Sequence, residues 1–486
     1  MNDKRYEQII VGAGFAGLCM GIKLKEAGMN DFLILERNAH IGGTWYDNSY
    51  PGAACDVESH LYSYSFEPKS DWSRNFGPQA EILQYMGYCV DKYQLAPHIR
   101  LNTAIAKAVY DESNGFWTVN AANGETYVAQ SLVTCSGGLS EPAFPDIKGI
   151  DTYKGEIFHS ARWDKKYDIN DKTVAVVGTG ASAIQIVPAI VSKVKKLELY
   201  QRTAPWILPK KDGEISGWRK SLYRVLPFMR TLYRKRLYWR NELMAIGFIV
   251  NPGIMKFGGK IVIRHLNSSI KNETLRKKLT PQFVLGCKRI LLSNEYYPAL
   301  EQSNVDVITD GIREINATGL LTKDGTQHNV DAIILATGFQ AAEGVLRFDV
   351  KGKGGVDLNE TWRDGAEAYL GTSIAGFPNF YIVVGPNTGL GHSSMLIMIE
   401  AQVNYIMQAL KTLKEKGAKS ADVKKEVEKK YNEEIQEKLA KSVWQSGGCV
   451  SWYQNKNGKN VALWPGFTFT FMKRTKDFEP EKYEWS

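Results

Sequence analysis

Two glycine-rich loops hold the residues of this 486-residue chain whose spacing points most directly to chemistry. The first loop runs Gly12-Ala13-Gly14-Phe15-Ala16-Gly17, between a short apolar run and a helical pattern. In such a loop one glycine permits a tight turn, one lets a pyrophosphate approach the backbone, and one lets a helix pack on a strand. Glu36 ends the next apolar run, where a carboxylate can accept hydrogen bonds from a ribose. The pattern predicts a dinucleotide site.

The second loop runs Gly178-Thr179-Gly180-Ala181-Ser182-Ala183 in the same context, but the strand that follows it ends in Gln201-Arg202-Thr203, without an acid. An arginine at the position of the ribose-binding carboxylate can pair with a 2′-phosphate, so Arg202 favours NADPH over NADH. The alternative is that Arg202 is an ordinary exposed arginine.

Two dinucleotide sites predict two cofactors. Because the chain starts directly with the first loop, we assign FAD to that loop and NADPH to the second, with hydride passing from NADPH to the flavin. The cysteines show no CxxC spacing, which argues against a dithiol redox centre, a zinc site and a disulfide framework. We therefore expect reduced, buried cysteines and no bound metal. The cysteines are Cys19, Cys55, Cys89, Cys135, Cys287 and Cys449.

The elements that position these loops are short apolar runs at 8–11, 32–35, 173–177 and 197–200, which are typical of buried parallel strands. They predict an α/β fold with two Rossmann-like dinucleotide-binding domains and a helical insertion in the NADPH domain. Glycine and proline clusters near 137–145 and 336–339 mark the crossings between domains. The predicted ranges are 1–140 for the first part of the FAD-binding domain, 141–340 for the NADPH-binding domain with its insertion at about 212–290, and 341–486 for the second part of the FAD-binding domain.

The charge and hydropathy of the chain limit the kinds of partner that it can bind. The net charge of +9 suits a nucleic acid, a membrane surface or an anionic dinucleotide. No apolar stretch approaches the roughly 20 residues of a membrane span, and the N-terminus lacks the pattern of a secretory signal, so we expect a soluble, cytoplasmic protein. Residues 218–240 are helical in pattern, basic and rich in aromatics. We expect them to form a wall of the substrate pocket, with membrane-surface contact as the less favoured alternative and no nucleic-acid partner. Residues 414–441 predict a charged, solvated helical region.

Two longer motifs carry a family resemblance. Tyr153-Lys154-Gly155-Glu156-Ile157-Phe158-His159-Ser160-Ala161-Arg162-Trp163-Asp164 resembles the FxGxxxHxxxW(P/D) signature of type I Baeyer-Villiger monooxygenases, with Tyr153 in place of the first Phe. Gly42-Gly43-Thr44-Trp45-Tyr46-Asp47-Asn48-Ser49-Tyr50-Pro51-Gly52-Ala53-Ala54-Cys55-Asp56 is similar to the GGxWxxxx(Y/F)PGxxxD motif of the same family. The motif residues are Gly155, His159, Trp163 and Asp164.

The resemblance implies an NADPH- and O2-dependent conversion of ketones to esters or lactones through a C4a-peroxyflavin. It implies that Arg289 stabilises the anionic peroxide, that Asp56 holds Arg289, and that Lys288 joins Arg202 at the 2′-phosphate. A guanidinium suits this role because its charge survives burial and its planar fork can be oriented. The expected FAD contacts are Gly12, Gly14, Phe15, Ala16, Gly17, Glu36, Arg37, Gly43, Thr44, Trp45, Asp56, Tyr62 and Ile105. The expected NADP contacts are Gly178, Thr179, Gly180, Ala181, Ser182, Gln185, Arg202, Thr203 and Lys288.

Four points stay open at this stage. A related flavin-containing monooxygenase that oxidises sulfur or nitrogen is the alternative function, and sulfoxidation can accompany ketone oxidation in one protein. His159 either influences the relative movement of the two domains, as the resemblance implies, or is simply a packed hinge residue. His392 and Ser393 are expected to cap a helix that begins at Met395. Monomer and homodimer are both compatible with the sequence.

Overall fold

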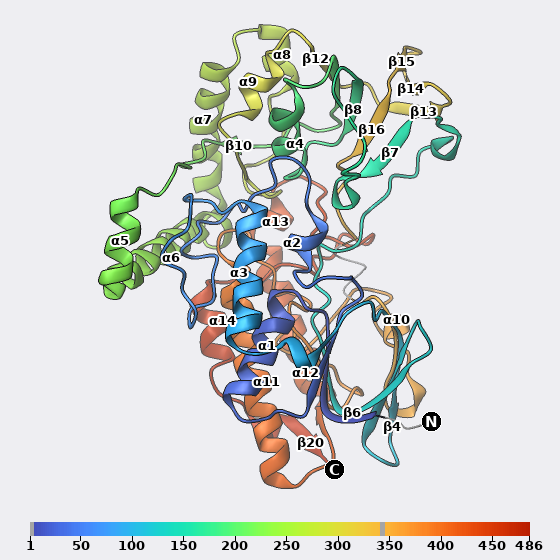
Figure 1. The fold of residues 1–486 in the computed structure, drawn as a ribbon, viewed down its shortest axis with the longest axis vertical. Helices are drawn as coiled ribbons and strands as arrows, with labels where there is room; N and C mark the ends of the chain where they lie inside the picture. Colours follow the sequence, from blue (N-terminus) through green and yellow to red (C-terminus); the bar gives the residue numbers. More distant parts are fainter. Residues whose placement is uncertain (1–3, 341–345) are drawn as a thin grey trace.

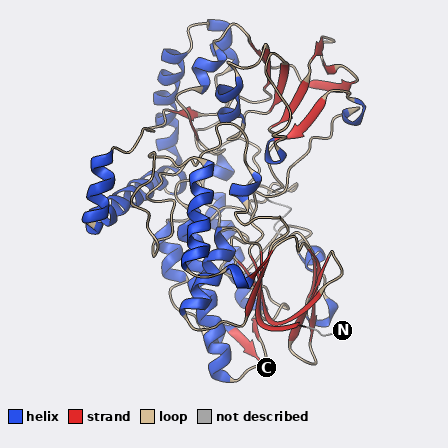
Figure 2. Cartoon of the chain, in the orientation of Figure 1, coloured by secondary structure: helices blue, strands red, loops and turns tan. Residues whose placement is uncertain are grey.

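The computed structural model describes residues 4–340 and 346–486. Figure 1 shows two sheet-containing bodies stacked along the long axis, with helices α5 and α6 projecting from one side. Figure 2 shows that helices cover the sheets and that loops fill the junction between the two bodies. The predicted boundary at 341 falls on residues 341–345, which lie outside the described residues.

The first body is built on an eight-stranded mixed sheet, in the order β17-β4-β5-β6-β1-β2-β3, with β18 also paired to β6. β1 pairs in parallel with β2 and β6, whereas β5 pairs antiparallel with β4 and β6. The strands are β1 Lys4–Val11, β2 Phe32–Leu35, β3 Ile99–Arg100, β4 Ile105–Asp111, β5 Phe116–Ala121, β6 Thr126–Thr134, β17 Asp349–Lys351 and β18 Phe380–Ile382. Segments from both ends of the chain therefore complete one sheet.

Helices pack beside this first sheet. α1 (Phe15–Glu26) lies against α11 (Met395–Lys416), and α3 (Gln79–Lys92) lies beside α1. α1 is buried along almost its whole length, since both of its neighbours and the sheet cover it. The other elements of this body are α2 Thr44–Asp47, α10 Leu358–Thr361, α12 Lys425–Ala440, α13 Val443–Ser446, α14 Thr468–Arg474, β19 Ala421–Val423 and β20 Tyr483–Trp485.

The second body is built on a five-stranded, wholly parallel sheet in the order β12-β9-β8-β16-β7. Its apolar runs are buried, as a parallel sheet covered on both faces requires. The strands are β7 Glu156–His159, β8 Thr173–Val177, β9 Lys196–Tyr200, β12 Val305–Ile308 and β16 Ala332–Leu335, with α4 Ala183–Ile190 and α9 Tyr296–Leu300 beside them. The smaller strands are β10 Ile207–Leu208, β11 Leu291–Leu292, β13 Ile312–Asn316, β14 Gly319–Thr322 and β15 Gln327–Asn329. The two strand-turn-helix units and their four buried strands lie where the sequence predicts them.

Four helices follow one another between β10 and β11: α5 (Gly217–Val225), α6 (Pro227–Ile249), α7 (Pro252–Ser269) and α8 (Glu273–Lys278). The helical pattern predicted for 218–240 is confirmed, although it divides into two helices. Pro227 stands at the first position of α6, where its missing N–H costs no hydrogen bond.

The charged helical region predicted for 414–441 is confirmed over 425–440, but residues 417–424 are not helical. α11 ends at Lys416, Gly417 follows with a φ of +61°, and β19 separates α11 from α12. A left-handed glycine is a common helix terminus, because it lacks the Cβ that makes this conformation costly. The charged residues therefore belong to two helices.

Candidate active site

The first glycine loop has the geometry of a pyrophosphate cradle. Gly12 has a φ of +105°, and a Cβ there would stand 2.8 Å from the carbonyl oxygen of Cys135. A Cβ on Gly17 would stand only 1.8 Å from the carbonyl oxygen of Gly12, so α1 starts directly on the turn. By contrast, a Cβ on Gly14 would meet only the Cα of Gly43, at 3.6 Å. The loop is closed toward the sheet and open at Gly14, which fits the approach of a diphosphate to a helix N-terminus.

Gly17→Ala is expected to prevent loading with FAD, because backbone blocks the added methyl and neither helix nor turn can yield. The flavin absorbance of the purified chain measures this. The matched control is Gly87→Ala in α3, where an added Cβ meets nothing within 4 Å. That variant should bind FAD normally and gain about 0.5–1 kcal/mol in free energy of unfolding. A Gly17→Ala chain with a full flavin complement would contradict the assignment.

Glu36 is held rigidly at the carboxyl end of β2. Its carboxylate accepts hydrogen bonds from the backbone N–H of Ala13, at 2.7 Å, and of Asn38, at 2.9 Å. Burial raises the pKa of Glu36, while these two backbone donors act to lower it. The acid therefore lies beside the glycine loop, in the place where the dinucleotide pattern puts it.

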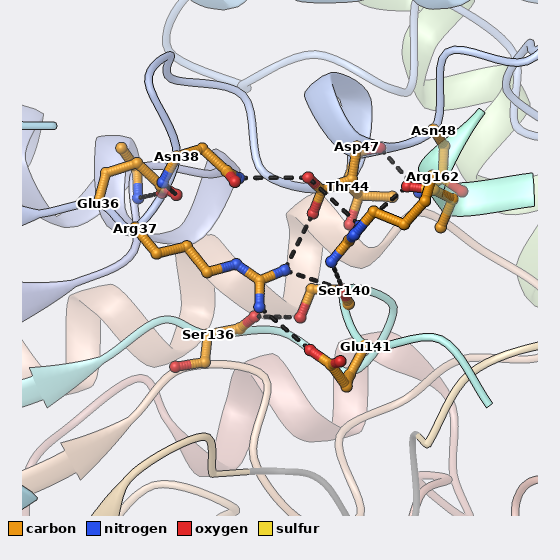
Figure 3. A network of polar contacts seen from close by, with 12 residues as sticks. Glu36, Arg37, Asn38, Thr44, Asp47, Asn48, Ser136, Ser140, Glu141 and Arg162 are labelled. Carbon is orange, nitrogen blue, oxygen red and sulfur yellow. Dashed lines mark hydrogen bonds and ion pairs between the residues drawn. The ribbon is translucent and has the colours of Figure 1, made fainter. Parts of the chain in front are cut away.

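Arg37 belongs to a network that joins the first motif to the second (Figure 3). Its guanidinium contacts Asp47 at 3.3 Å and Glu141 at 3.2 Å, and it donates to the carbonyl oxygen of Ser140. Arg162 lies 3.7 Å from the same Asp47 and also donates to Ser140. Asp47 thus connects the Gly42–Asp56 motif to the His159-containing motif, through two cations from different segments.

Aromatic side chains stand over the first loop. The rings of Phe15 and Tyr62 meet edge to face at 5.5 Å, and the indole N–H of Trp45 donates to the Tyr62 hydroxyl at 3.0 Å. Thr44 begins α2, and its carbonyl oxygen accepts from Asn48. Ile105 begins β4 and packs into the apolar core, so any contact that it makes with FAD would involve its backbone. Ala16 is buried in α1.

The second glycine loop has the same geometry as the first. Gly178 has a φ of +114°, and a Cβ there would stand 2.4 Å from the carbonyl oxygen of Ala336, whereas a Cβ on Gly180 would meet nothing. The Thr179 hydroxyl donates to the carbonyl oxygen of Thr203 at 3.0 Å, which ties the loop to the end of β9. Ala181 is exposed and Ser182 is half-buried, so the backbone of this loop faces open space.

Arg202 and Lys288 come together beside this loop from positions far apart in the sequence. Arg202 is exposed, and Lys288 is half-buried, with its ammonium 5.2 Å from the ring of Phe283. Burial and the positive charge of Arg202 both lower the pKa of Lys288. Among the residues that the structure describes, neither cation forms an ion pair with a carboxylate. Two neighbouring cations without an acid fit a bound dianion such as a 2′-phosphate.

Gln185 lies in the first turn of α4, and its backbone N–H donates to the carbonyl oxygen of Ser182 in the second glycine loop at 3.1 Å. Its side-chain oxygen accepts from the Tyr50 hydroxyl at 3.0 Å, and its amide donates to the carbonyl oxygen of Ala54 at 2.9 Å. Gly52 approaches the Gln185 backbone so closely that a Cβ would stand 2.6 Å from its oxygen. In this structure, Gln185 joins α4 to the Gly42–Asp56 motif.

Arg289 and Asp56 form the ion pair that the sequence predicts. The Nε and Nη2 atoms of Arg289 lie 2.8 Å and 2.7 Å from one carboxylate oxygen of Asp56. Both side chains are 29% exposed, so the pair is partly open to solvent and is not sealed in the core. Burial acts to raise the pKa of Asp56, but the Arg289 guanidinium outweighs it and holds that pKa below its usual value. The carboxylate raises the pKa of Arg289. The cation is permanent and oriented.

The surroundings of Arg289 include groups that sequence reasoning missed. The Nη1 atom of Arg289 lies 3.5 Å from the carbonyl oxygen of Leu390, in the loop before α11. Tyr453 is fully buried next to Arg289, and burial raises its pKa to about 12 while Arg289 acts to lower it. No local spacing identifies either group, because both reach the site through the fold.

The expectation that all cysteines are reduced is wrong. Cys287 and Cys449 form a disulfide, 162 residues apart in the chain. The other four cysteines are free and buried, as expected. The disulfide ties the segment that carries Lys288 and Arg289 to the segment that carries Tyr453. CxxC counting could not find it, because a pair so distant in sequence leaves no spacing signal.

His159 lies where the two crossings between the bodies run side by side. It is fully buried between the rings of Phe144, at 5.6 Å, and Phe339, at 5.8 Å. The crossings are joined by a hydrogen bond from the Ala143 N–H to the Gly338 carbonyl oxygen and by one from the Thr337 hydroxyl to the Ala143 carbonyl oxygen. His159 therefore packs at the hinge, away from the Arg289–Asp56 pair.

The other residues of this motif have structural contacts. A Cβ on Gly155 would stand 2.7 Å from the Asp331 carbonyl oxygen, and Trp163 packs on Phe158 with ring centroids 5.0 Å apart. Asp164 accepts from the backbone N–H of Lys166 in a local turn. The motif fixes the strand β7 and the hinge, and places Arg162 against Asp47.

Acid should destabilise the chain through His159. Burial lowers its pKa from 6.5 to about 4, so the unfolded chain takes up a proton at a pH where the folded chain does not. Stability is therefore lost as pH falls from about 6.5 to 4. We expect His159→Gln to reduce the loss of unfolding free energy between pH 7 and pH 4.5 by about 2–3 kcal/mol in urea titrations. The control is His40→Gln, at an exposed histidine, which should lose as much unfolding free energy between pH 7 and pH 4.5 as the wild type does. The prediction would be contradicted if His159→Gln also lost as much as the wild type.

The expected cap of α11 is displaced by one residue. Ser394 is the N-cap, and its hydroxyl accepts from the Leu396 N–H, whereas Ser393 and His392 do not cap the helix. His392 is buried 3.5 Å from the carboxylate of Glu242, which projects inward from α6. The helix thus begins beside the loop that contacts Arg289, with its backbone N–H groups at that end.

Two glycine cradles, the Glu36 carboxylate at the end of β2 and a partly exposed Arg289–Asp56 pair together fit a flavin- and nicotinamide-dependent oxidoreductase. A family model described as pyridine nucleotide-disulphide oxidoreductase matches residues 9–221. A Baeyer-Villiger monooxygenase of Pseudomonas aeruginosa is 48% identical over 475 residues, covering 98% of this chain and 90% of the relative. One of Streptomyces coelicolor is 44% identical over 476 residues, covering 98% and 92%.

Solved structures agree with these relatives. A complex of OTEMO with FAD and NADP has a TM-score of 0.90 and 27% identity, and a closed structure of cyclohexanone monooxygenase has a TM-score of 0.91 and 25% identity; each comparison covers 100% of both chains. The chain belongs to the Baeyer-Villiger monooxygenases. It is an FAD-dependent monooxygenase that uses NADPH, and the predictions of fold class and of both cofactors are confirmed.

Proposed function

We propose that this chain converts ketones to esters or lactones with NADPH and O2, and that Arg289 is its catalytic cation, held by Asp56. The observation that carries the proposal is the Arg289–Asp56 pair, in which two nitrogens of Arg289 lie 2.7–2.8 Å from one oxygen of Asp56 and both side chains are partly exposed. FAD, when bound, supplies the oxygen-activating chemistry.

The side chains of the site contribute to the reaction by stabilising charge and by holding the cofactors in position. Attack on a ketone carbonyl places negative charge on oxygen, and a fixed guanidinium stabilises that charge without reorganising. Asp56 keeps the fork of Arg289 in one orientation, and the Leu390 carbonyl oxygen marks the other side of the guanidinium. Arg202 and Lys288 would bind the 2′-phosphate of NADPH, and the loops at Gly12–Gly17 and Gly178–Ser182 would bind the two pyrophosphates.

We assign one cofactor to each of the two sheet-containing bodies. Residues 1–140 and 341–486 form the FAD-binding unit, and residues 141–340 form the NADPH-binding unit, with the helical insertion at about 212–290. Support comes from the strand order, since β17 and β18 return to the first sheet after β16 has completed the second.

Product analysis tests the function. The FAD-loaded chain is given NADPH with linear, cyclic and aryl ketones and, separately, with a thioether. Ester or lactone that carries one oxygen atom from labelled O2 is the expected product. Sulfoxide from the thioether, with no ester from any ketone, would overturn the proposal in favour of heteroatom oxidation.

A further inference from the structure

Large apolar side chains are exposed along the helical insertion, and we name them the outer stripe. All of them are 49–75% exposed. In α6 they recur every four or seven residues, which places them on one face of the helix. The outer stripe consists of Trp218 and Val225 on α5, Phe228, Leu232, Trp239, Leu243 and Val250 on or just after α6, and Ile254, Phe257 and Ile261 on α7.

The opposite faces of these helices are packed into the protein. Leu237, Ala245 and Phe248 of α6 and Met255 and Val262 of α7 are buried. The Arg234 side chain anchors α6 further, because it donates to the carbonyl oxygens of His60 and Leu61. The exposed stripe therefore lies on helices that are held in place, and it extends to α14, where Phe469 contacts Trp239 at 6.1 Å.

The charge of the insertion is strongly one-sided. Residues 217–269 contain eleven Lys and Arg residues and one acid, Glu242, so their formal charge is +10 while that of the whole chain is +9. Glu242 is 2% exposed and faces inward, toward His392. The exposed cations Lys235, Arg236, Lys260 and Arg264 form no ion pair with any residue that the structure describes.

We propose that the outer stripe and its flanking cations dock this protein on an anionic lipid membrane surface. Apolar and aromatic side chains in a stripe bordered by Lys and Arg are the composition of a helix that lies in a membrane interface. Tryptophans such as Trp218 and Trp239 favour that depth, since the ring is apolar and its N–H is polar. A nucleic-acid surface would match the charge but not the row of exposed aliphatic side chains. The membrane surface is preferred here because α6 has an apolar face that is buried in the protein and a second apolar face that points outward.

The helices lie on the membrane and do not cross it. Among the described residues no single helix is long and apolar enough to span a bilayer, and the pair α6 and α7 passes such a test only when joined across a 110° bend. One face of each helix is covered by protein, so lipid can reach only the outer stripe.

Docking would place the segment that carries Arg289 behind the helices that face the lipid. The inner faces of α6 and α7 pack on Gly286, where Phe248 and Met255 leave no room for a Cβ. Gly286 is three residues before Arg289, so the segment that carries the proposed cation packs against the inner faces of the helices whose outer faces would meet the lipid. As a consequence that rests on the proposed function, docking would bring apolar ketones dissolved in lipid close to the enzyme that oxidises them.

Vesicle flotation tests the docking without measuring activity. The FAD-loaded full chain should float with vesicles of equal parts phosphatidylcholine and phosphatidylglycerol, should stay at the bottom with phosphatidylcholine alone, and should be released by high salt. Leu232→Ser/Trp239→Ser should reduce the apparent affinity by tenfold or more, about the effect of losing one buried apolar side chain. Lys235→Gln/Arg236→Gln should reduce it by roughly 30-fold, at about 1 kcal/mol for each cation.

Matched variants keep the outcome interpretable. Val356→Ser removes an exposed apolar side chain outside the insertion, and Lys411→Gln/Lys430→Gln removes two exposed lysines of α11 and α12; both should float like the wild type. Flavin absorbance and NADPH oxidation in free solution show that each variant is folded. Wild-type protein that never floats with anionic vesicles, or a stripe variant that floats as well as the wild type, would overturn the proposal. A dimer that the stripe variant dissociates, without flotation, would assign this face to a second copy of the chain.

Discussion

Arg289→Ala is expected to lower ester formation by about 10³-fold or more while the purified chain keeps its FAD. A preorganised donor at a developing oxyanion contributes on the order of 10²–10³ in rate, and Arg289 is also a full charge fixed by Asp56 at 2.7 Å. The glycine cradle is formed by other residues, so flavin binding should not depend on this side chain. Ester yield and flavin absorbance, measured on the same preparation, separate the two effects.

Two further variants distinguish charge from orientation. Arg289→Lys keeps a cation but loses the planar fork, and we expect a partial loss. Asp56→Asn keeps the shape but not the charge that orients Arg289, and its effect should not add to that of Arg289→Ala, because the two residues act as a unit. Arg313→Ala removes an exposed arginine of β13 and serves as the control. Near wild-type ester formation in Arg289→Ala would refute the assigned role.

Local sequence was sufficient to predict the two glycine-rich loops and the strands that lead into them. The spacing of Gly12, Gly14 and Gly17 reflects contacts within a single strand-turn-helix unit, so it can be recognised without the fold. The parallel strands could be predicted for the same reason, since burial on both faces requires continuous apolar runs. The contact between Arg289 and Asp56 could be predicted only from the family resemblance carried by the long motifs. The two residues are 233 positions apart, and their spacing alone implies no contact.

Contacts made only by the tertiary structure were missed. Nothing near Gln185 indicates that its amide bonds Tyr50 and Ala54, and nothing near Cys287 indicates Cys449. In the 414–441 region a local signal for the break did exist, since Gly417 is a helix-ending residue, but the charge pattern continues across it. Charge patterns report solvent exposure, and they do not tell where a helix ends.

The outward face of α6 was hidden for a related reason. Apolar residues on two opposite faces of one helix blur the single-face pattern by which amphipathic helices are recognised. Only the buried set at Leu237, Ala245 and Phe248 shows that Phe228, Leu232 and Trp239 must face outward. Core packing therefore does not explain these three side chains, whereas contact with a binding partner at the protein surface can.

Arg202→Ala is expected to reduce kcat/KM for NADPH by about 10- to 100-fold and to leave kcat/KM for NADH nearly unchanged. A hydrogen bond to a charged group contributes roughly 1.5–3 kcal/mol, and only NADPH carries the 2′-phosphate that Arg202 would bind. Lys288→Ala should show the same selectivity, since Lys288 lies close enough to Arg202 that the charge of Arg202, after burial, helps to lower the pKa of Lys288.

The double variant tests whether the two cations share one phosphate. If they do, Arg202→Ala/Lys288→Ala should use NADPH and NADH with similar efficiency, and the combined loss should differ from the sum of the single losses. Lys193→Ala, at an exposed lysine after α4, is the control for a change in overall charge. Equal losses for NADPH and NADH in Arg202→Ala would mean that this arginine contributes to folding or to binding of the common part of the cofactor. The selectivity would then have to come from Lys288 alone, which its own single variant measures directly.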